Sequence, residues 1–407
     1  MSGIRKAFRD GTHRAQNPSV TLQRLKPLLP VMGISRVANV TGLDRLGIPV
    51  VMVCRPNARS ISVSQGKGLS LTAAKVSGVM EAVETYHAER IIRPLKLASF
   101  EELRYTHALV DVEGLPFCVD SDFDPDMPLL WIEGQNLLDE QSLWLPFELV
   151  HANYTLPLPS GSGCFTANTN GLASGNHLIE AMLHAVCEVI ERDALTLWHL
   201  LDDAARAATG VNPDSIDDTA CRDVLARFAQ AGVEVRIWEI TADTGVAAFF
   251  CLTADAEDVG AQPADGSGCH PVRAIALLRA LTEAAQVRTT YIAGSRDDIN
   301  AAEYSVAAKS AKLQACRTLM ACHQRVRTFD AGPHHDGETL DEDLHWVLAR
   351  LRAVGIEQVV TTDLTQPAFH LPVVRVVIPG LEGADESDDY LPGRRAMAFA
   401  GKTIMNA

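Results

Sequence analysis

The pattern of apolar positions predicts helices and strands mixed along the chain, without a regular βαβ repeat. Apolar residues and helix formers follow helical spacing in four long segments, residues 72–90, 178–201, 271–292 and 340–353. Runs rich in β-branched residues predict strands at residues 48–55, 233–241, 245–253, 359–362 and 373–378. Glycines and serines predict loops at residues 60–70 and 266–268. This mixture predicts a single α+β (mixed α/β) domain over residues 1–407, with sizeable sheets.

The first of these helices carries polar groups on one face. Ser77, Glu81 and Glu84 are spaced by four and three residues, so their side chains project together. Apolar residues flank them, namely Val76, Val79, Met80 and Val83. Two carboxylates on a partly buried face cost free energy unless another group compensates them.

The second helix repeats this arrangement. Glu180, His184, Glu188 and Glu191 follow at spacings of four, four and three residues, and they fall within an arc of about 80°. Arg192 lies at the edge of that arc. The residue before the helical segment that best fits an N-cap is Asn176.

Two acidic faces of this kind suit a hard cation with oxygen ligands. Mg2+ accepts carboxylate oxygens and bridges to substrate phosphates. A zinc site is disfavoured, because the chain has no H-E-x-x-H motif and no paired cysteines. A di-iron site would need Glu-x-x-His, whereas His184 precedes Glu188 by four residues. The alternative for each helix alone is a solvated face, which is what most such glutamate pairs form.

Two further segments are candidates for contacts with phosphate. Residues 64–68 read SQGKG, where glycines allow close backbone approach and Lys67 supplies charge. This is not a Walker A motif, and an ordinary turn is the alternative. Residues 281–298 include Gln286 and Arg288, for which the alternative is a set of surface ion pairs. The residues themselves thus indicate an acidic, magnesium-dependent, anion-binding protein.

Composition narrows the class of protein. The net charge of −15 argues against non-specific nucleic-acid binding, which needs a basic face. No apolar stretch has the length of a membrane helix or a signal peptide, so we expect a soluble protein in the cytoplasm. The nine cysteines are scattered and favour small core residues over disulfides or nucleophiles.

Three segments together resemble the YcaO family of ATP-dependent peptide-modifying enzymes. The first reads SQGKGLSLTAAKVSGVMEAVE, the second TNGLASGNHLIEAMLHAVCEVIERDA and the third LTEAAQVRTTYIAGSRDD. Their order is that of the nucleotide motifs of the family, and they span most of residues 60–300. The second segment is the most specific of the three.

The resemblance implies a fold, cofactors and site residues. The family fold is mixed α/β with large antiparallel sheets flanked by helices, and members are commonly homodimers. ATP and Mg2+ would serve to phosphorylate a backbone amide oxygen, and the resemblance identifies no separate catalytic residue. The residues implied in ATP binding are Lys67, Ser77, Glu81, Asn176, Glu180, Arg192, Gln286 and Arg288. Those implied in metal binding are Glu81, Glu84, Glu188 and Glu191.

The resemblance also indicates a branch of the family. Azoline-forming members typically end in a proline-rich segment, whereas this chain ends in AFAGKTIMNA. The segments GISRVANVTGLDRLGIPV and LPVVRVVIPGLEG are similar to the branch that pairs with TfuA proteins and is associated with thioamide formation. We therefore expect thioamidation of a peptide or protein, as in the biosynthesis of ribosomal peptide natural products, with a TfuA-like partner. The alternatives are azoline or amidine formation, and a non-catalytic accessory protein.

Overall fold

The computed structural model describes residues 3–255, 262–383 and 390–405. The chain forms two compact units that alternate along the sequence. Unit 1 comprises Met1–Arg5, Val83–Leu200 and Glu338–Ala407, and unit 2 comprises Lys6–Ala82 and Leu201–Gly337. The prediction of a single domain stays a prediction. In the described residues, no helix is long and apolar enough to cross a membrane.

Unit 2 contains two antiparallel sheets of three strands each. The first has the order β1-β2-β3 and the second β10-β9-β8. Their bounds are Arg36–Asn39 (β1), Val50–Cys54 (β2), Val63–Lys67 (β3), Val233–Glu239 (β8), Ala248–Asp255 (β9) and Ala264–Cys269 (β10). The helices with most of their length in this unit are α1 (Pro18–Leu25), α2 (Leu71–Ala88), α5 (Asp203–Ala207), α6 (Thr219–Gln230), α7 (Arg273–Ala293) and α8 (Val306–Cys322).

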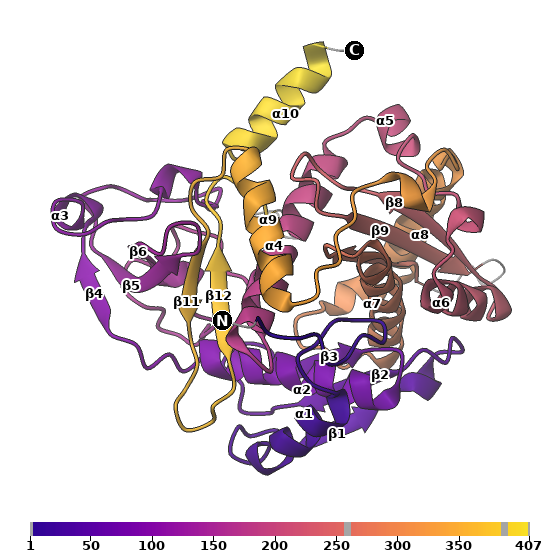
Figure 1. The fold of residues 1–407 in the computed structure, drawn as a ribbon, viewed down its shortest axis with the longest axis horizontal. Coiled ribbons are helices and arrows are strands. Elements are labelled where there is room, and N and C mark those ends of the chain that lie inside the picture. The colour runs from indigo at the N-terminus through magenta and orange to yellow at the C-terminus, as the bar shows by residue number, and fades with distance from the viewer. Residues whose placement is uncertain (1–2, 256–261, 384–389, 406–407) are drawn as a thin grey trace. The chain divides into compact units, whose positions relative to one another are not determined.

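Helix α7 packs on β9 and β10, where the core of unit 2 lies (Figure 1). A Cβ atom at Gly266 would lie 2.3 Å from the carbonyl oxygen of Ala280, and one at Gly268 would lie 2.1 Å from that of Ala276. Residues 266–268 lie in strand β10, so the predicted loop is wrong. The glycines there serve the close approach of a helix to a sheet.

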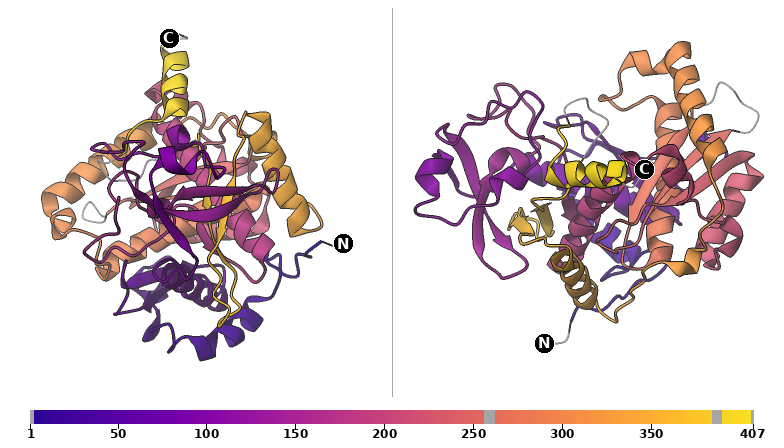
Figure 2. Two further views of the ribbon diagram at one scale, coloured as in Figure 1. Left: turned by 90° about the vertical axis from the view of Figure 1, so that its left-hand side faces the viewer. Right: turned by 90° about the horizontal axis from the view of Figure 1, so that it is seen from above.

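Unit 1 is built on a six-stranded sheet of antiparallel pairs with the order β4-β5-β11-β12-β7, in which β6 also pairs with β5. The strands are Leu95–Ala98 (β4), Leu129–Asn136 (β5), Ser142–Pro146 (β6), Leu172–Ser174 (β7), Val360–Asp363 (β11) and Val373–Val377 (β12). The helices are α3 (Phe100–Leu103), α4 (Leu178–His199), α9 (Leu340–Ala353) and α10 (Arg394–Met405). Helix α4 lies along β12 and β7 (Figures 1 and 2).

Short 3-10 helices connect these elements at Lys26–Leu28, Thr41–Leu43, Val112–Gly114, Phe147–Leu149, Pro213–Ser215, Ala301–Tyr304 and Phe329–Ala331. The mixed α/β fold with antiparallel sheets and flanking helices is confirmed. All four predicted helices exist, and α9 has the predicted bounds. Helices α6 and α8 lie outside the predicted elements, and the predicted loop at residues 60–70 contains strand β3.

Candidate active site

Strand β3 and helix α2 lie unusually close together in unit 2. A Cβ atom at Gly66 would lie 2.1 Å from the carbonyl oxygen of Ala74 and 2.1 Å from the amide nitrogen of Gly78. Only glycine fits such an approach of two backbones. Residues 64–67 of the segment SQGKG thus lie in strand β3 rather than in a loop, which corrects the predicted loop, and Gly66 brings the strand against the acidic helix.

This close approach lets the backbone of β3 bind the side chains of α2. The Gln65 amide donates to Oε1 of Glu81 at 3.1 Å, and the Lys67 amide donates to Oγ of Ser77 at 3.4 Å. The Gln65 side chain in turn accepts hydrogen bonds from α7, from Gln286 Nε2 at 3.3 Å and Thr290 Oγ1 at 2.5 Å. Gln65 therefore joins two predicted site residues, Glu81 and Gln286, although it was not itself predicted; its place two positions before Lys67 was the available signal.

The side chain of Lys67 forms an ion pair with Glu283 of α7, with 2.5 Å between Nζ and Oε2. About a quarter of each side chain is exposed, 23% for Lys67 and 25% for Glu283. Because the pair is partly solvated, the ammonium can exchange its carboxylate for a phosphate oxygen at modest cost. Lys67, Ser77, Glu81 and Gln286 thus gather around β3 within unit 2.

Glu81 is set in surroundings that disfavour its charge. Burial is the largest influence and raises the pKa of Glu81, and the nearby Glu283 adds to this effect. The Gln65 amide, Arg296 and Lys67 act in the opposite direction. The charged form of a carboxylate whose pKa is raised in this way is stabilised when a cation binds to it.

Arg288 lies on a different face of α7 from Gln286. Its Nε donates to Asp44 at 2.9 Å and its Nη1 donates to Asp255 at 2.9 Å. The guanidinium is buried, and its two carboxylate partners raise its pKa in spite of that burial. The structure therefore gives Arg288 an ion-pair network inside unit 2 and does not bring it to Lys67.

In unit 1, the start of α4 holds the next pair of predicted residues. The N-cap is His177, whose Nδ1 accepts from the Ile179 amide at 3.2 Å, so the expected Asn176 cap is wrong by one residue. Asn176 instead donates from Nδ2 to Glu180 Oε1 at 3.1 Å. Glu180 is buried in the first turn of α4, where the helix dipole favours a negative charge.

Glu84 of α2 belongs to unit 1 and is fixed by β7. Ser174 donates to its Oε1 from the amide at 2.9 Å and from Oγ at 2.6 Å. Glu84 follows Glu81 by three residues, so the two carboxylates share one face of α2. Ser174 is a second residue that was not predicted, although it stands two positions before Asn176.

Two further acids, Glu188 and Glu191, lie one turn apart further along α4. Burial raises the pKa of Glu188 to about 7, and the neighbouring Glu191 adds to that rise. Arg192, Arg375 and the Gly171 amide lower it without restoring the usual value. Carboxylate oxygens spaced by one turn of a helix match the ligands that Mg2+ accepts in proteins. Glu188 and Glu191 therefore fit the predicted metal, and His184 lies partly buried on the same helix.

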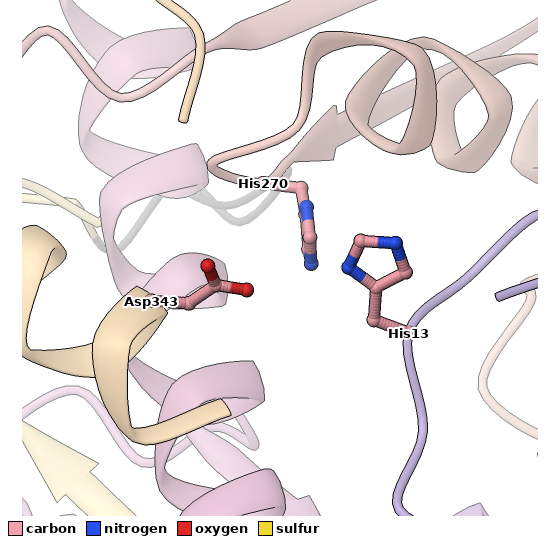
Figure 3. Close-up of side chains that lie close together, drawn as sticks. All are labelled: His13, His270 and Asp343. Atoms are coloured by element: carbon pink, nitrogen blue, oxygen red, sulfur yellow. The ribbon is translucent and has the colours of Figure 1, made fainter. Parts of the chain in front are cut away.

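A pair of histidines lies outside these acidic helices. In unit 2 the rings of His13 and His270 meet edge to face, with centroids 5.7 Å apart (Figure 3). Burial lowers the pKa of His13 to about 4 and holds that of His270 well below its ordinary value. Burial thus favours the neutral form of both rings. Asp343, also drawn in Figure 3, belongs to unit 1, where it is buried in the first turn of α9.

Residues 65–382 match a family model described as "YcaO cyclodehydratase, ATP-ad Mg2+-binding". This description contains both cofactors that were predicted, ATP and Mg2+, and confirms them. Among sequence relatives, the "Uncharacterized protein in tfuA 3'region" of Rhizobium leguminosarum bv. trifolii is 37% identical over 392 residues, which cover 94% of this chain and 92% of that protein. A protein of Methanothermobacter thermautotrophicus is 36% identical over 381 residues, with coverage of 91% and 95%.

Solved structures share the fold. YcaO from Methanopyrus kandleri, bound with AMPPCP and Mg2+, superposes with a TM-score of 0.76 at 21% identity, and covers 96% of this chain and 98% of its own. A heterocyclase in complex with substrate and cofactor has a TM-score of 0.78 at 22% identity and covers 94% of this chain. This chain spans only 54% of the length of that heterocyclase.

Proposed function

The chain belongs to the YcaO family, and from that premise we propose that it uses Mg-ATP to phosphorylate a peptide backbone amide and so form a thioamide, together with a TfuA-type partner. Membership of the family makes it an ATP-dependent peptide-modifying enzyme. The observation that carries the proposal is the pair of acidic helices α2 and α4, in which burial raises the pKa of Glu81 and of Glu188 and so disfavours their charge. Such carboxylates cost stability unless a cation binds to them.

We assign the metal to Glu81, Glu84, Glu188 and Glu191. Mg2+ would neutralise charge on the phosphates when bound. Lys67 and Arg192 supply cationic groups to phosphate oxygens, while Ser77, Asn176, Glu180 and Gln286 position the nucleotide through hydrogen bonds. We leave Arg288 out of this assignment, because Asp44 and Asp255 already neutralise it.

The proposed chemistry balances with sulfide as the sulfur source. The sulfur adds to the amide carbon, a C–S bond forms, and the amide oxygen attacks the γ-phosphorus of ATP, with ADP as leaving group. Breakage of the C–O bond then releases phosphate and leaves the C=S bond. Amide, hydrogen sulfide and ATP give thioamide, ADP and phosphate. Phosphorylation is needed because an amide oxygen is a poor leaving group and phosphate is a good one.

A TfuA-type partner is supported by the Rhizobium relative, which is named for its position beside tfuA. A partner that selects the peptide or delivers sulfur would complement a chain in which we identify no peptide-recognition module. Assembly into homodimers and a place in the cytoplasm stay predictions.

The second candidate is azoline formation, in which a Cys, Ser or Thr side chain of the peptide attacks instead of sulfide. The description of the family model as a cyclodehydratase favours it. The two reactions share the phosphorylation step and differ in the product. Mass spectrometry distinguishes them, because a thioamide exchanges oxygen for sulfur whereas an azoline loses water.

The test of the proposal follows the oxygen atom of the amide. A peptide substrate with a heavy-oxygen label in its backbone carbonyl is incubated with the full chain, Mg-ATP, sulfide and the partner. We expect the label to leave in inorganic phosphate and sulfur to replace it in the peptide. Label in phosphate with loss of water would establish azoline formation. Retention of the label in a modified peptide would contradict amide phosphorylation altogether.

A further inference from the structure

Arg375 of β12 is a buried cation without a carboxylate partner. Its exposed fraction is 4%, and no carboxylate oxygen of the described residues lies within salt-bridge distance of it. Nη2 donates to Oδ1 of Asn168 at 3.3 Å, while Nε has no hydrogen-bond partner among the described residues. A buried guanidinium in this state is costly. Such a cost is recovered when an anion binds.

Two more buried donors lie around Arg375. Thr362 of β11 is its direct cross-strand partner, so both side chains project from the same face of the sheet. The Thr362 hydroxyl is buried and has no hydrogen-bond partner in the residues that the structure describes. Beyond Thr362 the row continues with Gly134 of β5, where a Cβ atom would lie 3.1 Å from Thr362 Oγ1. A glycine thus keeps space beside the hydroxyl.

His151 supplies the third donor. Its Nδ1 accepts from the Asn153 amide at 3.1 Å, so in the neutral ring the proton is on Nε2. Nε2 is buried, and within the described ranges it has no partner. Burial and the nearby charge of Arg375 lower the pKa of His151 to about 4, which keeps the ring neutral and Nε2 a donor. Tyr154 also lies in the electrostatic field of Arg375.

A glycine loop connects this group of donors to the acidic helix α4. The carbonyl of Gly171 accepts from the Val376 amide at 2.8 Å, and the Gly171 amide hydrogen-bonds to Glu188. Gly171 has φ of +78°, and a Cβ atom there would lie 2.3 Å from the carbonyl oxygen of Val376. The loop therefore holds β12 beside Glu188, whose charge interacts with Arg375 without forming an ion pair.

From these contacts we infer that Arg375, Thr362 and His151 form an oxyanion subsite for a phosphate group, adjoining the magnesium ligands of α4. The inference rests on the proposed function, since it takes the phosphate to be that of the nucleotide or of the product. Hydrogen-bond donors that lack an acceptor can bind the oxygens of a phosphate group, and a guanidinium group binds phosphate oxygens well. The Glu188 carboxylate adjoins this subsite, so a Mg2+ ion bound to Glu188 could also bind an oxygen of the phosphate.

Matched variants of the full chain test this subsite. Arg375→Met keeps the length of the side chain and removes its charge, and Thr362→Val removes the hydroxyl. The control is Thr361→Val, because Thr361 is also buried with an unpartnered Oγ1 in the described part of the chain, yet alternation along β11 points it to the opposite face. The probes are inorganic phosphate alone, then AMPPCP and ADP, each with Mg2+.

We expect phosphate, against chloride at equal ionic strength, to raise the melting temperature of the wild type and of Thr361→Val but not of Arg375→Met. Loss of the charged hydrogen bond from the guanidinium should weaken AMPPCP or phosphate binding about 10- to 100-fold in Arg375→Met. Loss of the neutral hydrogen bond from the hydroxyl should weaken it about 2- to 10-fold in Thr362→Val. Unliganded Arg375→Met should melt no lower than the wild type, because it loses an uncompensated buried charge. If Arg375 served only the stability of the fold, unliganded Arg375→Met would instead melt below the wild type.

The ligands identify the source of the phosphate. A loss for AMPPCP but not ADP assigns the subsite to the transferred phosphoryl group, whereas a loss for inorganic phosphate alone assigns it to the product. Wild-type affinity of Arg375→Met for all three probes overturns the subsite but leaves Mg-ATP binding intact. Phosphate binding that depends on Arg375, in a wild-type chain that binds no nucleotide, contradicts the proposed function and keeps the subsite. If Arg375→Met does not fold, Thr362→Val against Thr361→Val decides alone, and equal affinities in that pair overturn the inference.

Discussion

Carboxylates that have a cationic partner in the chain contrast with Glu188 of α4; within unit 1 itself, Asp193 pairs with Arg395 at 2.8 Å. In unit 2, Asp255 accepts from Arg288 and Arg45, and Glu239 pairs with Arg273 at 2.7 Å. In unit 1, Glu188 has no Lys or Arg nitrogen within 4 Å among the described residues, and the adjacent Glu191 raises its pKa further. The first arrangement is complete in the chain itself. The second becomes favourable only when a cation is supplied, which is why we count Glu188 among the metal ligands.

The largest expected effect comes from removing charge on α4. Glu188→Gln and Glu191→Gln keep the shape and helix propensity of the side chains. ATP turnover with saturating Mg2+ should fall about 100-fold or more, because phosphoryl transfer depends on positioned charge. The melting temperature without metal should stay equal or rise, since like-charge repulsion is relieved.

The control for these variants is Glu357→Gln, which changes an exposed glutamate of unit 1 and should leave both quantities unchanged. A folded Glu191→Gln chain with wild-type turnover would show that α4 carries an ordinary solvated face. The contrast between Glu188 and the ion-paired carboxylates would then have no functional meaning.

The next largest effect concerns the ion-pair network of Arg288 in unit 2. Arg288→Met leaves Asp255 buried beside a single cation, so unfolding free energy should fall by roughly 3–5 kcal/mol. Chemical denaturation measures this, with exposed Arg222→Met as the control. Nucleotide affinity of the folded variant should stay near that of the wild type. Full stability combined with lost ATP binding would restore Arg288 to the site.

The smallest expected effect is the pH dependence that Glu188 gives to the free energy of unfolding. Its pKa is raised from 4.5 to about 7, so the folded metal-free chain holds this proton more tightly than the unfolded chain. The contribution to stability is fully present below the unfolded pKa and is lost as pH rises through about 7. Unfolding free energy of the wild type minus that of Glu188→Gln should therefore fall over this range. A pH-independent difference would mean that Glu188 titrates normally. The charges that act on Glu188, those of Arg192, Glu191 and Arg375, are unchanged in the Glu188→Gln variant.

The sequence predicted the acidic faces because helical spacing is a local property. Glu81 with Glu84, and Glu188 with Glu191, share a face in any α-helix, and α9 was bounded correctly by its apolar period. The glycines were misread for a physical reason. Gly66 and Gly266 mark close approach of a helix to a strand, and glycine gives the same signal in a turn.

Other parts of the site depend on pairings that a single sequence does not reveal. Arg288 follows Gln286 in the same motif, but Asp44 and Asp255, which bind it, come from distant segments. Arg375 stands in an apolar run, and only the register of β11 against β12 sets Thr362 opposite it. The cap at His177 differs from the expected one because either side chain can accept at that turn.

The central claim is that the carboxylates of α2 and α4 bind ATP through Mg2+. Calorimetric titration of the full chain with ATP, with Mg2+ and again with a chelator in its place, measures it directly. We expect binding with Mg2+ and little or none with the chelator, because the carboxylates of Glu81, Glu84, Glu188 and Glu191 repel a bare triphosphate. Equal affinity under both conditions would contradict the account.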